Sequence, residues 1–230
     1  MKKAVILLSG GLDSATILHY AKAKGFSPHC LIFDYGQRHR VELKRAAGLA
    51  RGVGCPYRIV KIDLPWGGSA LLDKKIGLPK RRAIDPREIP ATYVPARNII
   101  FLSFAASFAE AVGARAIFIG ANAIDYSGYP DCRPEFFRRF QQALDQGLKS
   151  GVQKKTIRIY APLLHKTKAQ IIQMGLKLKV PYERTWSCYK GGRRPCGVCD
   201  SCLLRRRGFE EAGLKDPAVV TRSQGHPSPG

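Results

Sequence analysis

The sequence lacks long hydrophobic runs. No apolar stretch in its 230 residues approaches the roughly eighteen uninterrupted apolar residues typical of a membrane-spanning helix. The first residues, Met1-Lys2-Lys3, lead straight into a strand-like apolar pattern and do not resemble a cleavable signal. These absences argue against a membrane protein or a secreted one. We therefore expect a soluble, cytoplasmic protein without a membrane partner.

Acidic residues are scarce. The chain has 17 Asp and Glu against 39 Lys and Arg, which gives a formal net charge of +22. Such basicity is typical of nucleic-acid binding. However, basic clusters such as Lys74-Lys75 and Arg205-Arg206-Arg207 are not interleaved with the aromatic residues that stack on bases. The charge leaves two interpretations open: a nucleic-acid partner, or a basic surface suited to an anionic small molecule.

A disulfide framework is also absent. The seven cysteines are odd in number, and four of them crowd into fifteen residues. This distribution favours a reduced compartment and one metal site, formed by Cys188, Cys196, Cys199 and Cys202. Four thiolates at this spacing suit one tetrahedral Zn²⁺ ion, in a structural role because a closed site leaves no position open for catalysis. An iron–sulfur cluster is the alternative, since spacing alone does not settle the metal.

Apolar runs that end in polar loops alternate with helical patterns along the chain. The expected strands lie at 4–8, 29–33, 57–62, 116–120 and 157–161. This alternation predicts an α/β fold: an open, mainly parallel, doubly wound five-stranded sheet flanked by helices, with a small C-terminal zinc-binding segment. The helix expected at 97–109 is apolar around its whole girth, so we expect it to be nearly enclosed.

The chain is expected to have three parts. Residues 1–185 form the α/β domain, 186–216 form the four-cysteine segment with a short helix, and 217–230 form a disordered tail. Within the first part, residues 63–95 lose all periodicity and are interrupted by proline and glycine. Loops of this length in compact domains are often functional, so we expect a lid or insertion loop there.

The first expected strand runs into residues 9–14, Ser-Gly-Gly-Leu-Asp-Ser, and then into a helical pattern. A strand, a glycine turn and a helix aim unpaired N–H groups and the positive end of a helix dipole at an anion, most often phosphate. The turn lacks the lysine of the common phosphate loop. Its Asp13 would repel phosphate unless a cation such as Mg²⁺ lies between them.

This string resembles the signature of the ATP-pyrophosphatase (PP-loop) superfamily, which has an adenine nucleotide alpha hydrolase-like fold. Its members cleave ATP between the α- and β-phosphates and adenylate a substrate oxygen. Three further stretches, at 33–39, 94–98 and 127–136, follow in order and precede the cysteine cluster. Together they resemble the 7-cyano-7-deazaguanine synthase family over residues 4–217.

The resemblance implies an ATP-dependent carbon–nitrogen ligase. Such an enzyme converts 7-carboxy-7-deazaguanine and ammonia to the nitrile 7-cyano-7-deazaguanine (preQ0), in queuosine-type deazapurine biosynthesis. It also suggests a homodimer that does not require nucleic acid. The residues that it implies for ATP binding are Leu8, Ser9, Gly10, Gly11, Leu12, Asp13, Ser14, Ala15, Thr16, Ile17 and Leu18.

The same resemblance suggests individual roles. Asp13 is expected to hold Mg²⁺, and Arg97 and Lys166 are expected to stabilise charge that develops on the phosphates. These three residues are the catalytic candidates.

For the deazaguanine, Asp125 and Asp131 are expected to accept hydrogen bonds from its amino and ring N–H groups, because a carboxylate can accept two bonds side by side. Tyr126 is expected to stack on or cover the ring.

Two rival functions use the same features differently. A PP-loop tRNA-modifying enzyme would suit the basic charge and the metal site, and it predicts tight, salt-sensitive tRNA binding. A zinc-stabilised nucleic-acid-binding module without catalysis would leave residues 9–14 unexplained.

Overall fold

Five parallel strands form one sheet in the computed structural model, which describes residues 1–79, 88–124, 128–192 and 194–220. The sheet order is β3-β2-β1-β4-β5. The strands are β1 (Lys2–Leu7), β2 (Phe26–Asp34), β3 (Tyr57–Lys61), β4 (Ala116–Phe118) and β5 (Arg158–Tyr160). The predicted open parallel sheet is confirmed, with strand ends within three residues of the predicted ones.

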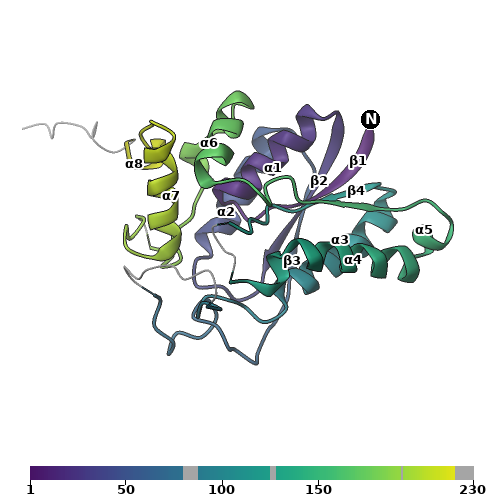
Figure 1. The fold of residues 1–230 in the computed structure, drawn as a ribbon, viewed down its shortest axis with the longest axis horizontal. Helices are drawn as coiled ribbons and strands as arrows, with labels where there is room; N and C mark the ends of the chain where they lie inside the picture. Colours follow the sequence, from purple (N-terminus) through teal and green to yellow (C-terminus); the bar gives the residue numbers. More distant parts are fainter. Residues whose placement is uncertain (80–87, 125–127, 193, 221–230) are drawn as a thin grey trace, which may run out of the picture.

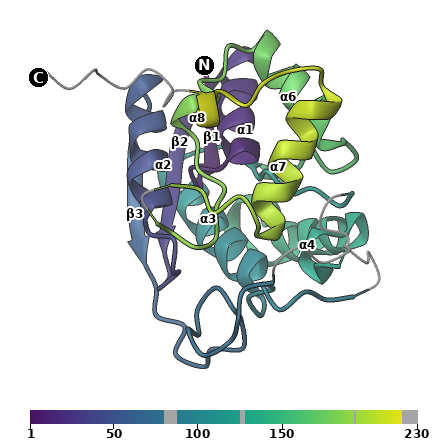
Figure 2. The same ribbon diagram turned by 90° about the vertical axis from the view of Figure 1, so that its left-hand side faces the viewer.

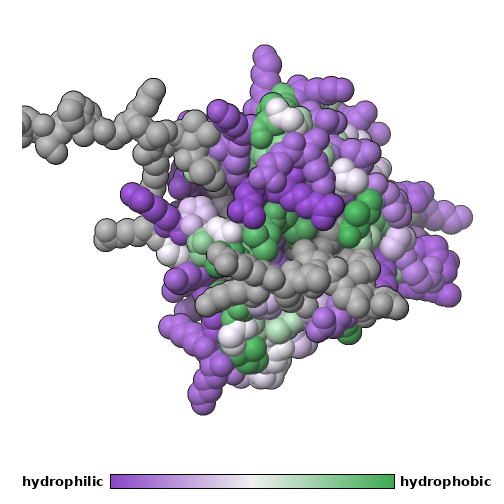
Figure 3. All heavy atoms as spheres, turned by 60° about the vertical axis from the view of Figure 1, so that its left-hand side comes forward, coloured by the Kyte–Doolittle hydropathy of each residue, from purple (hydrophilic) through white to green (hydrophobic). Residues whose placement is uncertain are grey.

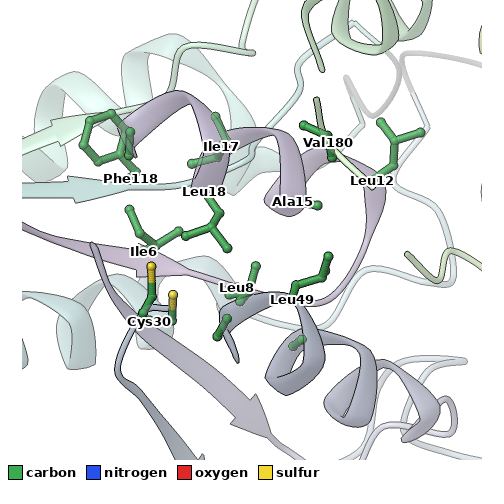
Figure 4. Close-up of a cluster of buried hydrophobic side chains, with 14 of the residues drawn as sticks. Ile6, Leu8, Leu12, Ala15, Ile17, Leu18, Cys30, Leu49, Phe118 and Val180 are labelled. Carbon is green, nitrogen blue, oxygen red and sulfur yellow. The ribbon is translucent and has the colours of Figure 1, made fainter. Parts of the chain in front are cut away.

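The central strand β1 is buried on both faces, as its unbroken apolar run predicts. Ala4 and Ile6 pack into the core on one side of the sheet, and Val5 and Leu7 pack into the core on the other. Figure 4 shows Ile6 and Leu8 in the first core, between side chains of two helices. β1 is therefore fixed from both sides, and so is the chain that leaves its carboxyl end.

Helices cover both faces of the sheet (Figure 1). Side chains of α1, α2, α6 and α7 pack in one core, and those of α3 and α4 pack in the other. Figure 2 shows the same layers from a second side. The helix bounds are α1 (Leu12–Ala23), α2 (Val41–Gly52), α3 (Arg97–Val112), α4 (Pro134–Gly147), α5 (Lys149–Val152), α6 (Lys168–Lys177), α7 (Asp200–Glu211) and α8 (Pro217–Val220), with short 3₁₀ turns η1 (Pro130–Cys132) and η2 (Tyr182–Arg184).

Helix α3 is less enclosed than its sequence predicts. Leu102, Ala105 and Ala109 are fully buried against the sheet, but Ile99 and Phe104 are 41% and 43% exposed. Among the described residues no further layer covers this outer side. The prediction of a nearly enclosed helix was wrong. Apolar residues on all sides of a helix allow it to be buried, but the fold decides how many elements pack against it.

The described residues of the 63–95 excursion form neither helix nor strand, yet parts of them are tied to the domain. Ser69 and Ala70 are fully buried, and the backbone N–H of Ala70 donates to the carbonyl of Ala91 at 2.7 Å. The backbone of Leu71 accepts a bond from that of Arg38 at 3.1 Å. Residues 80–87 lie outside the described part, so a lid function for the excursion stays a prediction.

The C-terminal chain continues the fold past residue 216. Arg205 on α7 forms a buried ion pair with Asp216 at 2.6 Å, and α8 follows directly. The predicted tail therefore begins with an ordered turn of helix, while residues 221–230 lie outside the described part. Within the described residues, no helix combines the length and apolar character needed to cross a membrane.

Hydrophilic side chains dominate the outline of the face drawn in Figure 3, while hydrophobic side chains gather nearer its centre. The described basic residues are spread over many elements, from Lys22 on α1 to Arg206 on α7. This wide distribution does not by itself favour either interpretation of the net charge.

Candidate active site and metal centre

A cavity of about 230 Å³ lies at the carboxyl ends of the strands. Its wall includes the ends of β1 and β2, the residues after β4, the first turns of α1 and α3, and one side of the C-terminal segment. Because β2 and β4 lie on opposite sides of β1, the topological switch point falls beside β1. Open parallel sheets bind their ligands at this point. The cavity lies at the edge where the sequence places its polar loops.

The turn between β1 and α1 is held by its two hydroxyl side chains. Ser14 Oγ accepts bonds from the backbone N–H of Ser9 at 3.2 Å and from Ser9 Oγ at 3.0 Å. Ser9 Oγ in turn accepts from the backbone N–H of Gly11 at 3.3 Å. Among the described residues, no side chain caps the start of α1. Its first N–H groups and its positive dipole end therefore stay available to an anion.

Gly10 makes this turn possible, and we expect Gly10→Ala to destabilise the protein by about 2–4 kcal/mol. Its φ of +82° is strained for any L side chain. An added Cβ would lie 2.5 Å from the carbonyl oxygen of Glu42 and 2.8 Å from the backbone nitrogen of Ala46, which adds an overpacking cost. Urea unfolding measures the loss.

Gly25 is the matched control for this substitution. It has nearly the same φ, +79°, but a Cβ there would meet no atom within 4 Å. Gly25→Ala should therefore cost only about 1–2 kcal/mol, the backbone share. Equal losses from the two variants would show that the close approach to α2 has no energetic effect.

Asp13 is paired with Lys168 across the cavity. Lys168 Nζ donates to both carboxylate oxygens of Asp13, at 2.9 Å each. Lys168 is the first residue of α6, whose start is fixed by a capping box between Thr167 and Gln170, as the sequence predicts. Among the described residues, the cavity wall includes Lys168 but not Lys166. In the structure, the lysine that reaches the turn at residues 9–14 is thus Lys168, two positions after the predicted Lys166.

A glycine on α7 provides room for the stem of Lys168. A Cβ on Gly208 would lie 2.3 Å from Lys168 Cγ and 2.7 Å from its Cβ. The side chain of Lys168 is 8% exposed, so its ammonium reaches the cavity from a packed position. The direction of this lysine therefore depends on the C-terminal helix.

Arg97 and Asp131 meet at the start of α3, but only Arg97 is part of the cavity wall. Asp131 Oδ2 accepts the backbone N–H of Asn98 at 3.0 Å, and Asn98 Nδ2 donates to the backbone carbonyl of Asp131 at 3.1 Å. Asp131 is 4% exposed and satisfies an N–H group of the first turn of α3. In this structure it orients the helix that carries Arg97, and its predicted contact with the substrate stays a prediction.

Cys132 lies on the cavity wall and is expected to be chemically inert. Burial, together with the carboxylate of Asp131, raises the pKa of the Cys132 thiol to about 12. The thiol therefore stays protonated near neutral pH and is a poor nucleophile. Iodoacetamide at pH 8 should leave Cys132 unmodified in the native protein and modify it after unfolding in urea, as read by peptide mass spectrometry. Native labelling at the rate of a free thiol would contradict this assignment.

A chain of buried polar groups links the end of β2 to the start of α2. Gln37 accepts the backbone N–H of Tyr35 at 2.8 Å and donates to the carbonyl of Phe33 at 3.0 Å and to Glu42 Oε1 at 2.9 Å. His39 Nε2 lies 3.0 Å from Glu42 Oε2. His39 and Glu42 both line the cavity. The sequence singled out the loop at 34–39 but gave no signal for Glu42, which lies inside a helical pattern.

Four cysteine sulfurs come together beyond the cavity. The Sγ atoms of the predicted ligands all lie within 4.8 Å of one another, and these are Cys188, Cys196, Cys199 and Cys202. An ion with Zn–S bonds of about 2.3 Å would hold tetrahedral sulfurs about 3.8 Å apart, so the cluster has the size for one ion. Hydrogen bonds from the Cys199 and Cys202 thiols lower the pKa of Cys188. The donor set therefore fits a metal ion that binds thiolates.

The cysteine segment touches the phosphate turn directly. The backbone N–H of Trp186 donates to the carbonyl of Gly10 at 2.9 Å, and the indole N–H of Trp186 donates to the carbonyl of Cys188 at 2.8 Å. Trp186, Ser187 and Tyr189 all line the cavity. Cys188, the first candidate metal ligand, is thus two residues from Trp186, which braces the turn.

Comparison with known proteins assigns the family. The family described as "Queuosine biosynthesis protein QueC" matches residues 3–213. The chain belongs to this family.

Its relatives in the family have consistent names. A protein of Thermoplasma acidophilum named 7-cyano-7-deazaguanine synthase is 57% identical over 217 residues, which is 94% of this chain and 91% of that protein. Proteins with the same name from Anaeromyxobacter sp. and Nostoc punctiforme are each 54% identical, over 96% and 94% of this chain and 97% and 99% of theirs.

Solved structures show the same fold at low identity. An NMN synthetase from Francisella tularensis superposes with a TM-score of 0.50 and 16% identity, over 93% of this chain and 78% of that one. A predicted tRNA methyltransferase subunit from Methanocaldococcus jannaschii gives a TM-score of 0.50 and 15% identity, over 94% and 90%. These likenesses concern the fold alone.

The predicted site residues divide into three groups in this member of the QueC family. Seven of them line the cavity, namely Leu8, Ser9, Gly11, Leu12, Asp13, Ser14 and Arg97. Gly10 is not part of the wall, and its carbonyl is bonded to the backbone N–H of Trp186. The helix residues Ala15, Thr16, Ile17 and Leu18 are buried behind the turn and are not part of the wall. Asp125 and Tyr126 lie outside the described residues, so their roles stay predictions.

Proposed function

We propose that the protein is an ATP-dependent 7-cyano-7-deazaguanine synthase that converts 7-carboxy-7-deazaguanine and ammonia to the nitrile. The observation that carries the proposal is the cavity at the switch point, where the start of α1, the Asp13–Lys168 pair and Arg97 converge. Identity of 54–57% to proteins with this name supports the choice of substrate.

The proposed reaction explains why a phosphate-binding turn is needed. A carboxylate is a poor acyl donor, so ATP first converts one of its oxygens into a leaving group. Ammonia then displaces that group and gives the amide. A second activation, now of the amide oxygen, is followed by elimination to the nitrile. Both rounds begin with activation of an oxygen on the same carbon, so one cavity can serve both.

The proposed roles follow the geometry of the wall. The turn at residues 8–14 binds the phosphates through its backbone N–H groups. Asp13 is the candidate ligand for Mg²⁺, which supplies positive charge to the phosphates when bound. Arg97 and Lys168 stabilise charge on the leaving group in a site shielded from water. Lys166, predicted from the sequence for the same task, is a second candidate.

Recognition of the deazaguanine is proposed for the loop after β4. Asp125 and Tyr126 keep the roles that the sequence predicts. Among the described residues, Asn122 and Tyr129 of the same region line the cavity. The amide of Asn122 bonds the backbone of Ile124 and Lys166, and the hydroxyl of Tyr129 bonds Thr92 at 2.8 Å, so these two side chains shape the wall that the ligand would meet. Asp131 is proposed to act through its contact with α3.

The cysteine cluster is proposed to hold one structural Zn²⁺ ion per chain. All four of its positions would be filled by thiolates, which leaves no coordination site for a reaction. We further propose a homodimer in the cytoplasm and the division into domains at residues 1–185 and 186–216. Sedimentation velocity tests the dimer.

The proposed function is tested by a defined reaction. Purified protein is incubated with ATP, Mg²⁺, ammonium and 7-carboxy-7-deazaguanine, with no RNA present, and the product is identified by mass. We expect the nitrile, and omission of ATP or ammonium should prevent its formation. Absence of the nitrile, together with salt-sensitive tRNA binding, would favour a tRNA-modifying enzyme instead.

A further inference from the structure

Two side chains of the cavity wall have no task in the proposed function. They are His39, in the loop after β2, and Glu42, in the first turn of α2. Relative exposure is 4% for His39 and 9% for Glu42, so both are nearly withdrawn from solvent. A buried acid and a buried histidine beside a reaction cavity need a reason, because burying either group costs free energy unless its polar atoms are bonded.

Glu42 is fully engaged as a hydrogen-bond acceptor. Its Oε1 accepts from Gln37 Nε2 at 2.9 Å, and its Oε2 lies 3.0 Å from His39 Nε2. Gln37 cannot turn its amide around, because its oxygen accepts the backbone N–H of Tyr35 and its nitrogen also donates to a backbone carbonyl. Both oxygens of Glu42 therefore face donors.

This arrangement determines which nitrogen of His39 carries the proton. Nε2 must present its N–H to the carboxylate of Glu42, so in the neutral ring the lone pair lies on Nδ1. Histidines that act as bases have the same arrangement: a carboxylate, here that of Glu42, orients the ring through one nitrogen, and the other nitrogen, here Nδ1, keeps a lone pair.

The Nδ1 atom of His39 is buried, and among the described residues it has no hydrogen-bond partner. Leaving a buried acceptor unpaired costs about 1–3 kcal/mol. On its Cα side the residue is covered by the cysteine segment, since a Cβ on Gly191 would lie 2.8 Å from His39 Cα. The ring of Tyr189 is 5.7 Å away, centre to centre. Bulk water is therefore not the obvious partner of Nδ1.

The proposed reaction needs a group of this kind. When ammonia attacks the activated carboxyl carbon, a C–N bond forms and the bond from carbon to the activated oxygen breaks, with its electron pair leaving on that oxygen. The nitrogen must then lose one proton to become the neutral amide.

We propose that His39, oriented by Glu42, is the general base that accepts this proton at Nδ1 and releases it to the water that enters the cavity when the product leaves. The inference rests on the proposed function and adds to it a residue for the nitrogen-transfer step. It assigns no part in ATP activation to His39. The two steps can therefore be separated by experiment.

Two substitutions of His39 separate a base from a structural support. His39→Gln places an amide N–H where Nε2 was, which keeps a donor to Glu42 but removes the lone pair of Nδ1. His39→Asn is too short to reach Glu42 and also lacks the base. His29→Asn is the control, because His29 lies on β2 far from its carboxyl end and is not in the cavity wall.

Each protein is measured in two assays. Rapid quench without ammonium counts the ATP cleaved per site in the presence of 7-carboxy-7-deazaguanine, which reports activation. A second assay with saturating ammonium measures amide and nitrile formation. For His39→Gln we expect activation within about twofold of the wild type and nitrogen transfer at least about 100-fold slower, with the loss in kcat rather than in the KM for ATP. The control should match the wild type in both assays.

Three results would overturn the inference or its basis. Nitrogen transfer at the wild-type rate in His39→Gln, but not in His39→Asn, would show that His39 only supports the fold. Loss of the ATP burst in His39→Gln would mean that the residue builds the ATP site. If the wild-type protein itself makes no nitrile, the proposed function fails, and that failure is visible before any variant is compared.

Discussion

Removal of the proposed metal from the four-cysteine site is expected to abolish nitrile formation and to weaken ATP binding about 2- to 10-fold, the equivalent of one lost hydrogen bond. Without the ion, four thiols lose their common ligand and the segment that they hold loses its shape. That segment includes Trp186, whose N–H braces the carbonyl of Gly10 at 2.9 Å. The turn at residues 9–14 would lose one of its supports even though none of the four cysteines is part of the cavity wall.

The measurement is calorimetric ATP binding before and after dialysis against a chelator, with recovery after Zn²⁺ is added back. Cys196→Ser should reproduce the chelated state. Cys55→Ser is the matched control, because the thiol of Cys55 is buried but lies outside the cluster. The Cys55→Ser protein should therefore keep the metal content of the wild type. Unchanged ATP affinity in the metal-free protein would mean that the cysteine segment and the turn are energetically independent.

Lys168→Met is expected to lower kcat/KM by about 10²–10³-fold, the usual cost of removing one preorganised group that stabilises transition-state charge. Methionine keeps a stem of similar shape against Gly208 but removes the ammonium that lies 2.9 Å from both oxygens of Asp13. The variant therefore loses a positive charge near the phosphates and leaves the carboxylate of Asp13 without this partner.

Lys166→Met is the control that decides between two neighbouring lysines. Lys166 precedes the capping residue of α6 and is not part of the described cavity wall, so we expect a loss of less than about tenfold. Steady-state kinetics with ATP as the varied substrate measures both variants. A larger loss for Lys166→Met than for Lys168→Met would favour Lys166, as the sequence predicts, over the lysine that is bonded to Asp13 in the structure.

The parts of this fold that could be predicted are those that depend on residues close together in the sequence. The unbroken apolar run of β1 indicates a strand buried on both faces, and residues 9–14 indicate a turn for an anion. The capping box at Thr167 gives the start of α6 to the residue. It also places Lys168, which the sequence suggests as a second contributor beside Lys166, as the first residue inside the helix, while Lys166 lies before it.

The remaining features depend on contacts between distant residues. Asp131 bonds the backbone of Asn98, 33 positions earlier, and no periodicity relates a loop carboxylate to the start of another helix. Glu42 has the ordinary spacing of an exposed helix residue, yet Gln37 and His39 enclose it. The exposure of Phe104 on α3 is set by which faces of the sheet receive helices. Each of these features follows from the packing, which a single sequence does not contain.

The bond between Trp186 and Gly10 also orders events during synthesis on the ribosome. The turn at residues 9–14 is made before its strand β1 can pair with β4, which requires residue 118. The brace at Trp186 arrives later still, on the order of 10 s or more after the turn at ribosomal speeds of about 5–20 residues per second. In a nascent chain the turn therefore stays without this support until a distant part of the sequence has been made and has folded back onto it.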